Sequence, residues 1–304
     1  MTLSESHAEF RSALIDAELL VPTGVDGLYG RSGAFEDIID GIDRVVVSAG
    51  AGDDATRLRF PPLMPRAVFE RTDYLASFPN LAGSVHTFTG GDAEHAALLA
   101  QHERGEDWTT SLHPAGVVLQ PAACHPLYPL NTGRLPEAGR LYDVYGYCFR
   151  HEPAIDPARL QSFRMHEYVY LGYPDAALAH REKWVGRGME VLEALGLKAE
   201  AVVANDPFFG RVGRMLAVNQ RDEVLKIELV VRLYGDDEEG TAVVSSNCHR
   251  DHFGVNFAIT TADDAVAHSA CVGFGMERIA LALLRTHGLD SQRWPAPLRG
   301  RLWT

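Results

Sequence analysis

The sequence contains no apolar run near the roughly 18 residues that a membrane-spanning helix needs. Its first ten residues, MTLSESHAEF, lack the basic region and following apolar region of a secretory signal. Cysteine is scarce, and no two of its four copies form a CxxC pair: Cys124, Cys148, Cys248 and Cys271. This usage favours reduced thiols over a disulfide framework and leaves the thiols available for a metal. We therefore expect a cytoplasmic protein without a membrane partner.

Positive charge is also in short supply. The 304 residues include 28 lysines and arginines against 41 aspartates and glutamates, which gives a net charge of −13. This sign disfavours a nucleic-acid partner, because an acidic surface repels phosphate. Hydrophobic residues make up 46% of the chain and charged residues 23%, the balance of a folded globular protein. At this length, one large domain and two unequal domains are both open.

Several short motifs of common enzyme classes are missing. The chain has no GxxxxGK[ST] phosphate loop, no GxGxxG, no HExxH and no GxSxG. It also has no internal repeat and no low-complexity tract. Its longest polar stretch, residues 236–239, lies between two glycines and predicts a solvated turn.

Hydrophobic periodicity predicts helices toward both ends of the chain and strands between them. Apolar residues from Phe35 to Val46 recur with helical spacing, and a strand at 58–60 runs into two prolines. Further elements are expected as a strand at 117–119, an antiparallel hairpin from 141–150 and 163–169, a helix from Pro174 to Gly196, strands at 224–231, 241–246 and 253–259, and a helix from Met276 to Gly288. Because helices and strands do not alternate strictly, the pattern predicts an α+β fold.

A dispersed set of arginine, acidic and aromatic residues is the candidate for chemistry. Arg150 and Glu152 follow the first hairpin strand, Phe163 and Glu167 share a face of the second, and Arg278 lies in the last helix. Arginine offers a fork of donors for phosphate, a carboxylate accepts from an adenine amino group, and an aromatic ring stacks on the base. The set suits a nucleoside triphosphate. From the residues alone, surface arginines and a core phenylalanine remain the alternative.

The order of these residues resembles the motifs of class II aminoacyl-tRNA synthetases. Phe149-Arg150-His151-Glu152, a loop and Phe163 resemble motif 2, and the run from Gly273 to Arg278 resembles motif 3. The helix from Phe35 and the strand before Pro61 are similar to motif 1, through which these enzymes pair. Residues 245–248 with Phe253 are most similar to the seryl branch. The resemblance implies an antiparallel sheet flanked by helices and a homodimer.

A typical seryl-tRNA synthetase begins with a long helical arm that grips tRNA, and no such helical hairpin is found here. The chain therefore resembles the amino acid:[carrier protein] ligases, which load a small amino acid onto the phosphopantetheine thiol of a carrier protein. The resemblance runs from about Phe10 to the C-terminus and implies a single catalytic domain over residues 1–304. It implies that glycine or alanine is activated by ATP as an aminoacyl adenylate and passed to a phosphopantetheinylated acyl carrier protein, with no tRNA expected.

The resemblance also implies a zinc site. Cys124, Glu167 and Cys271 would lie on neighbouring parts of the sheet, and two thiolates with one carboxylate leave tetrahedral zinc an open position for the amino acid's α-amine. Glu167 is therefore also a substrate-binding residue. The spacing of the three residues carries no such information by itself, and buried inert cysteines are the alternative. Three histidines are expected to be solvated or to pack in the core: His249, His252 and His268.

Roles in ATP binding follow from the same resemblance. Arg150 is expected on the α-phosphate and Arg278 on the γ-phosphate, as the catalytic pair, with Glu152 reading adenine and Phe163 stacking on it. The full set expected around ATP is Arg150, Glu152, Arg159, Leu160, Phe163, Lys226, Glu228, Ala242, Val243, Val244, Ser245 and Arg278. Magnesium is expected near Glu228 and residues 242–245. Thr241 stands where a glutamate is usual, so the second magnesium ligand is open. Apart from the resemblance, Lys226 and Glu228 suit a surface ion pair.

Two rival functions remain open. One is a truncated seryl-type synthetase that acts with a partner in trans, and the other is a non-catalytic regulatory paralogue, against which the presence of both Arg150 and Arg278 counts. Carrier proteins are acidic like this chain, so docking requires a local basic patch. The candidates are the helix with Arg181 and Arg187 and the segment 208–214, although each is equally well explained as a solvated face.

Overall fold

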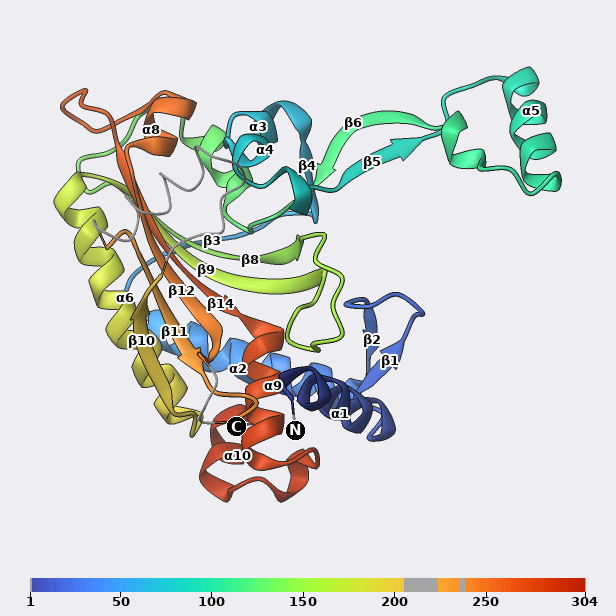
Figure 1. Cartoon of the computed structure of the whole chain (residues 1–304). Helices are drawn as coiled ribbons and strands as arrows, with labels where there is room; N and C mark the ends of the chain where they lie inside the picture. The colour runs from blue at the N-terminus through green and yellow to red at the C-terminus, as the bar shows by residue number, and fades with distance from the viewer. Residues whose placement is uncertain (1, 205–223, 236–238, 304) are drawn as a thin grey trace.

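The computed structural model describes residues 2–204, 224–235 and 239–303. The strands of its central sheet are β3 (Thr56–Arg59), β8 (Arg140–Phe149), β9 (Ser162–Gly172), β10 (Ala199–Val203), β11 (Lys226–Val231), β12 (Thr241–Arg250) and β14 (His268–Gly275). They form a seven-stranded sheet in the order β10-β11-β12-β14-β9-β8-β3 (Figure 1). Neighbouring strands are antiparallel except β3, which runs parallel to β8.

Helices cover one face of this sheet. They are α2 (Gly33–Gly50), α6 (Pro174–Ala194) and α9 (Met276–His287), and α1 (Leu3–Asp16) and α10 (Ala296–Trp303) complete the same core. Because side chains alternate along a strand, Tyr168, Val272 and Phe274 enter this core. Ser32 caps α2 through its hydroxyl, and the apolar stripe from Phe35 to Val46 is buried. The predicted amphipathic helix and the α+β class are confirmed.

The opposite face of the sheet carries a smaller core. Phe163, Met165 and Val169 of β9 point to it, as their alternation predicts. Glu167 lies between Met165 and Val169 on the same face, and Cys271 of β14 is the register partner of Val169. One end of this face is covered by η3 (His125–Asn131), α8 (His252–Phe257), β7 (Gly133–Arg134) and β13 (Ile259–Thr260).

The predicted hairpin is confirmed: β8 and β9 pair from Arg140 with Leu171 to Phe149 with Ser162. The strand predicted at 253–259 is wrong, because residues 252–257 form α8. Phe253 and Phe257 lie four residues apart on one helical face against Tyr128, whereas Val255 between them is 60% exposed. Apolar residues at every second position therefore indicated a strand, but only the two outer ones enter the core.

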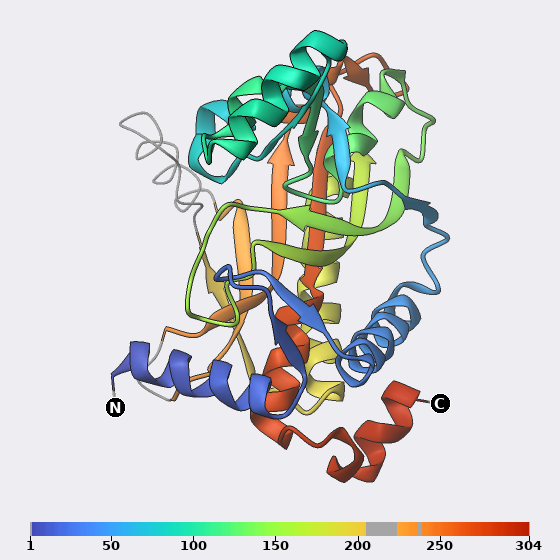
Figure 2. The same ribbon diagram turned by 90° about the vertical axis from the view of Figure 1, so that its right-hand side faces the viewer.

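An arm projects from the body of the molecule (Figure 1). It consists of β5 (Ser84–Thr87), α5 (Asp92–Glu103) and β6 (His113–Leu119). At its base, β4 (Leu63–Pro65), α3 (Arg66–Glu70) and α4 (Tyr74–Ser77) lie against the body, and the sheet order is β4-β6-β5. Helix α5 stands at the far end of the arm, in front of the body in Figure 2, and has no buried residue. At the N-terminal end, β1 (Leu20–Pro22) and β2 (Tyr29–Arg31) form a hairpin. Within the described ranges, no helix is both long enough and apolar enough to cross a bilayer.

Candidate active site

Three predicted residues meet on the face of the central sheet opposite the helices α2, α6 and α9. One ligand atom from each of Cys124, Glu167 and Cys271 lies within 4.8 Å of the others, and all three side chains are buried. Cys124 lies between β6 and η3, while Glu167 and Cys271 come from the adjacent strands β9 and β14. The backbone N–H of Ala123 donates to Glu167 Oε1 at 2.8 Å, which fixes the carboxylate.

The charges of this cluster are strongly coupled. A hydrogen bond between the two sulfurs raises the pKa of Cys124 and holds the pKa of Cys271 well below its usual value. Burial, followed by the charge of Cys271, raises the pKa of Glu167 to about 7. Two sulfur donors and one carboxylate are the ligand types that zinc takes, and three protein ligands leave its fourth position open. The donor set therefore fits zinc.

Three further side chains surround this cluster, and sequence reasoning gave none of them a role. His249 Nε2 lies 3.5 Å from Cys271 Sγ, and Asn247 Nδ2 lies 3.8 Å from the same sulfur. Tyr128 is fully buried and stacks on Phe253 with ring centroids 3.7 Å apart. His249 packs against Phe253, as expected, but its contact with a cluster sulfur was not expected. Its position follows from strand register, which pairs Asn247 with Cys271 and which the sequence does not reveal.

The three predicted phosphate-binding arginines lie near one another. Arg278 at the start of α9 donates to the carbonyl oxygens of Ala158 and Ala242, each at 2.9 Å. Burial, followed by the charges of Arg150 and Arg159, lowers the pKa of Arg278. The chain thus concentrates positive charge beside the loop between β8 and β9, although its net charge is −13. Such a concentration suits a polyanionic ligand.

The predicted adenine-binding residues flank these arginines. Phe163 is half-buried, and the guanidinium of Arg150 lies 5.4 Å from its ring centroid. Glu152 lies 3.6 Å from the exposed Arg159. Gly273 pairs with Glu167 in the register of β14 and β9, so β14 carries no side chain beside this carboxylate.

Strands β11 and β12 contribute the other predicted ATP-binding residues unequally. Lys226 and Glu228 form an ion pair at 2.9 Å, but Lys226 is only 8% exposed, so the expected surface pair is wrong. Strand register aligns Glu228 with Ser245, on the face that carries the cluster. The side chains of Val243 and Val244 are instead buried in the helix-side core. Leu160, in the loop between β8 and β9, is buried as well. These apolar residues offer a ligand little more than main-chain atoms.

A buried ion network supports Arg278. Its neighbour Glu277 is 1% exposed and accepts the backbone N–H and the Nε–H of Arg164, both at 2.7 Å. Arg31 Nη2 lies 3.3 Å from the same carboxylate, and Glu36 of α2 binds the other side of Arg164. The network ties the start of α9 to β9, β2 and α2. Sequence reasoning missed Glu277, because nothing local distinguishes it from a surface acid in a first helical turn.

The expected docking arginines differ in accessibility. The guanidinium of Arg181 is buried and donates to the carbonyl oxygen of Val224, so a solvent-facing role for it is wrong. Arg187 is partly exposed and pairs with Asp53. The other docking candidate, residues 208–214, lies outside the described residues, as do residues 236–238 of the expected acidic turn.

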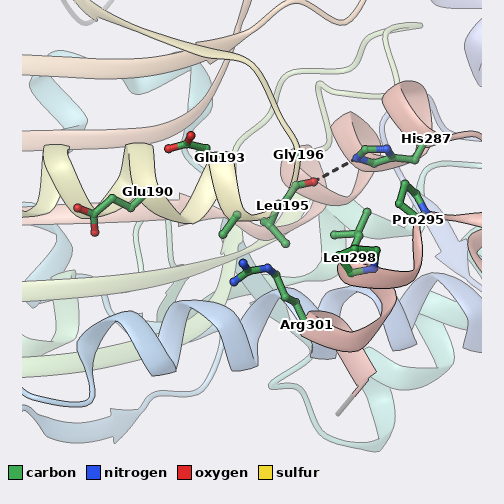
Figure 3. A pocket seen from close by; sticks show the side chains of 10 residues that line it. Glu190, Glu193, Leu195, Gly196, His287, Pro295, Leu298 and Arg301 are labelled. Carbon is green, nitrogen blue, oxygen red and sulfur yellow. Dashed lines mark hydrogen bonds between the residues drawn. The ribbon is translucent and has the colours of Figure 1, made fainter.

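A cavity of about 470 Å³ lies away from all these residues (Figure 3). It is lined by the C-terminal ends of α6 and α9 and by the start of α10, with His287 Nε2 hydrogen-bonded to the carbonyl oxygen of Leu195 at 3.1 Å. None of its lining residues belongs to the predicted site.

The chain was compared with protein families and with curated proteins. No family model matches the chain. It is 46% identical over 279 residues to amino acid–[acyl-carrier-protein] ligase 1 of Bradyrhizobium diazoefficiens, covering 91% of this chain and 85% of that protein. Ligase 2 of the same organism is 47% identical over 281 residues, with 92% and 84% covered. The type-2 serine–tRNA ligase of Methanopyrus kandleri is 31% identical over 273 residues, which cover 80% of this chain and 50% of that protein.

Solved structures show the same fold at lower identity. M. kandleri SerRS in complex with A. aeolicus tRNASec superposes with a TM-score of 0.83 at 22% identity, covering 96% of this chain and 59% of that one. The seryl-tRNA synthetase of Pyrococcus horikoshii complexed with ATP gives 0.68 at 16% identity, covering 100% and 63%. The predicted class II synthetase-like fold is confirmed.

Proposed function

This chain belongs to the amino acid–[acyl-carrier-protein] ligase family, and we propose that its buried Cys124, Glu167 and Cys271 cluster holds a zinc ion and the amino acid substrate. The protein is a ligase that activates an amino acid with ATP and transfers it to a carrier protein. One observation carries the site proposal. Two thiols and one carboxylate that are far apart in sequence have ligand atoms within 4.8 Å of one another, on the face of the sheet opposite the helices.

Zinc bound to these ligands would supply an open Lewis-acid position for the α-amine of the amino acid. Ala123 orients the Glu167 carboxylate through its backbone N–H. Burial of the cluster excludes water from the ligands and strengthens every charge interaction there. No general base is needed for activation, because the carboxylate of an amino acid is already ionised near neutral pH.

We propose that ATP lies between the arginines and β11–β12. Arg150 and Arg278 would stabilise the charge that grows on the phosphate oxygens, and Arg159 would close over them from its exposed loop. Phe163 would stack on adenine while Glu152 accepts from its amino group. Magnesium would be held near Glu228 and Ser245 by oxygen ligands, with the second protein ligand left unassigned. Two observations support these assignments. Glu228 and Ser245 lie on the face of the sheet that carries the cluster, and the three arginines lie near one another.

The amino acid is proposed to be glycine or alanine. Tyr128, Phe253 and His249 pack against one another beside the thiol cluster, with His249 edge-on to the Phe253 ring at 5.0 Å. We expect this aromatic wall to limit the size of the substrate side chain. One methyl group changes binding by about 1–3 kcal/mol, so we expect a preference between the two substrates with some leakage.

The assembly proposed is a two-fold homodimer. Among the described residues, β3 is an edge strand of the central sheet, and beside it lies a cavity of about 270 Å³ lined in part by Gly50, Arg57 and Tyr168. An unpaired edge is a natural surface for a second copy, and two-fold pairing is the commonest symmetry of soluble oligomers. Light scattering at micromolar concentration tests this, and a monomeric mass would contradict it.

A phosphopantetheinylated acyl carrier protein is proposed as the acceptor, docking in part at Arg187. Reversing the charge at Arg187 should abolish transfer and leave pyrophosphate exchange intact, because adenylation does not involve the carrier. The single catalytic domain, the cytoplasmic location and the absence of a tRNA partner stay predictions.

The competing function is that of a seryl-type synthetase, favoured by 31% identity to a type-2 serine–tRNA ligase of which the chain covers half. One experiment separates the two. ATP–pyrophosphate exchange over the small amino acids identifies the substrate, and the activated amino acid is then offered to a phosphopantetheinylated carrier protein or to total tRNA. Transfer to the carrier alone supports the proposal. Efficient charging of tRNA without transfer to any carrier would overturn it, and a folded protein without exchange activity would instead indicate a regulatory paralogue.

A further inference from the structure

Each of the three metal-cluster ligands has a hydrogen-bond donor beside it. Glu167 accepts the backbone N–H of Ala123 at 2.8 Å. Cys271 has His249 Nε2 at 3.5 Å and Asn247 Nδ2 at 3.8 Å. The remaining ligand, Cys124, hydrogen-bonds to Cys271 and Glu167 within the cluster, and the nearby group outside the cluster is the hydroxyl of Tyr128.

The Tyr128 hydroxyl is a buried polar atom without a hydrogen-bond partner among the described residues. Its ring packs against one face of α8, with centroid distances of 3.7 Å to Phe253 and 5.9 Å to Phe257. Tyr128 belongs to the same buried core cluster as Cys124 and Cys271. Cys124 is the N-cap residue of η3 and Tyr128 follows it by four residues, so the thiol and the ring come from the same short helix. A buried donor of this kind is costly unless an acceptor is supplied.

His249 is oriented from its other nitrogen. Its Nδ1 lies 3.0 Å from the hydroxyl of Ser269, which is itself buried. If the Ser269 hydroxyl donates to Nδ1, the ring proton is on Nε2, which faces Cys271. The ring also packs edge-on against Phe253 at 5.0 Å. One side of the imidazole is therefore fixed by a serine and the other is directed at a ligand sulfur.

We propose that Tyr128 and His249 are positioning residues that each donate a hydrogen bond to one zinc-bound thiolate, Tyr128 to Cys124 and His249 to Cys271. This inference rests on the proposed zinc site. A zinc-bound cysteine is a thiolate and hence an acceptor, which supplies the partner that the Tyr128 hydroxyl needs. Two thiolates and a carboxylate bring three negative charges to a divalent ion, and the two donors spread this excess. They orient the sulfurs and keep the metal a strong enough Lewis acid to bind an amine.

The test measures metal binding by the full-length protein rather than its activity. Zinc affinity is measured by competition with a chromophoric chelator after metal removal, for Tyr128→Phe and His249→Phe. Each variant should bind zinc about 10- to 100-fold more weakly, as for loss of an outer-shell partner. The matched control is Tyr142→Phe, which deletes a buried hydroxyl of the same core cluster that donates to Asn131 Oδ1 at 2.8 Å. His249→Gln can retain a donor at the position of Nε2 and should recover most of the affinity.

Replacing zinc with cobalt gives an absorption band that would not shift if Tyr128 and His249 had only a structural role. Removing a donor from a thiolate raises the energy of its electron pairs, so the sulfur-to-cobalt charge-transfer band of Tyr128→Phe and His249→Phe should shift to longer wavelength. The bands of Tyr142→Phe and His249→Gln should stay close to that of the unaltered protein. The two arms are independent, so a variant that fails to fold leaves the other decisive.

Failure of the inference differs from failure of the zinc site. If the unaltered protein and Cys271→Ser bind zinc equally, or if neither binds it, the zinc proposal itself is wrong. If the unaltered protein binds zinc tightly while Tyr128→Phe and His249→Phe keep the same affinity and the same cobalt band, the zinc site stands and the two donors have no role.

Discussion

Replacing Glu277 with glutamine tests whether the buried ion network holds the start of α9. The Glu277 carboxylate accepts two hydrogen bonds of 2.7 Å from Arg164 and lies 3.3 Å from Arg31. Glutamine keeps the shape of the side chain but removes its charge. Two arginines that are almost withdrawn from water then lose their common partner.

The expected loss of stability follows from burial. Removing one partner of a buried ion pair costs about 3–5 kcal/mol, because the other charge is left uncompensated. Arg164 keeps Glu36 as a second partner, so we expect the lower end, about 3 kcal/mol. For a domain of this size, each kcal/mol lowers Tm by about 2–4 °C, so Glu277→Gln should lower Tm by roughly 6–12 °C.

The assay is urea and thermal unfolding at one protein concentration, since a dimer would make Tm concentration-dependent. Glu36→Gln is the matched control: Glu36 binds the same guanidinium, but its side chain is 37% exposed, so its loss should cost less than about 1 kcal/mol. A loss below 1 kcal/mol for Glu277→Gln, or equal losses in the two variants, would refute the reasoning.

Three further predictions concern the ligands. Phe163→Ala should weaken ATP binding by about 1–3 kcal/mol if the ring covers adenine, and an unchanged KM for ATP would exclude stacking. Arg150→Ala or Arg278→Ala should lower adenylation by about 10²- to 10³-fold in pyrophosphate exchange, whereas full activity in folded variants would make these residues structural. Elemental analysis should find about one zinc per chain, lost in Cys271→Ser and retained in Cys148→Ser; metal retained in the first variant would contradict the assignment.

Sequence periodicity predicted those features that depend on neighbouring residues. The stripe from Phe35 to Val46 marks α2, and alternation along β9 places Phe163 and Glu167 on one face. Periodicity failed for residues whose burial depends on partners far away in the sequence. Lys226 lies on β11, between β10 and β12, and is only 8% exposed, and Arg181 donates to a carbonyl oxygen 43 residues away.

The sequence by itself determined most strands of the central sheet and the helices that cover it and, through the order of its arginines and aromatic residues, the family that they resemble. Only the tertiary structure decided which residues meet. Strand register sets Cys271 opposite Val169 and Gly273 opposite Glu167, and the turn after β6 brings Ala123 to a carboxylate 44 residues away. Register and loop position are fixed by the packing of a whole sheet, a non-local balance of burial and hydrogen bonding that no short window of sequence contains. For that reason the sequence assigns no role to Tyr128 and His249, and only the tertiary structure places Tyr128 in one buried cluster with the cysteines and His249 beside Cys271.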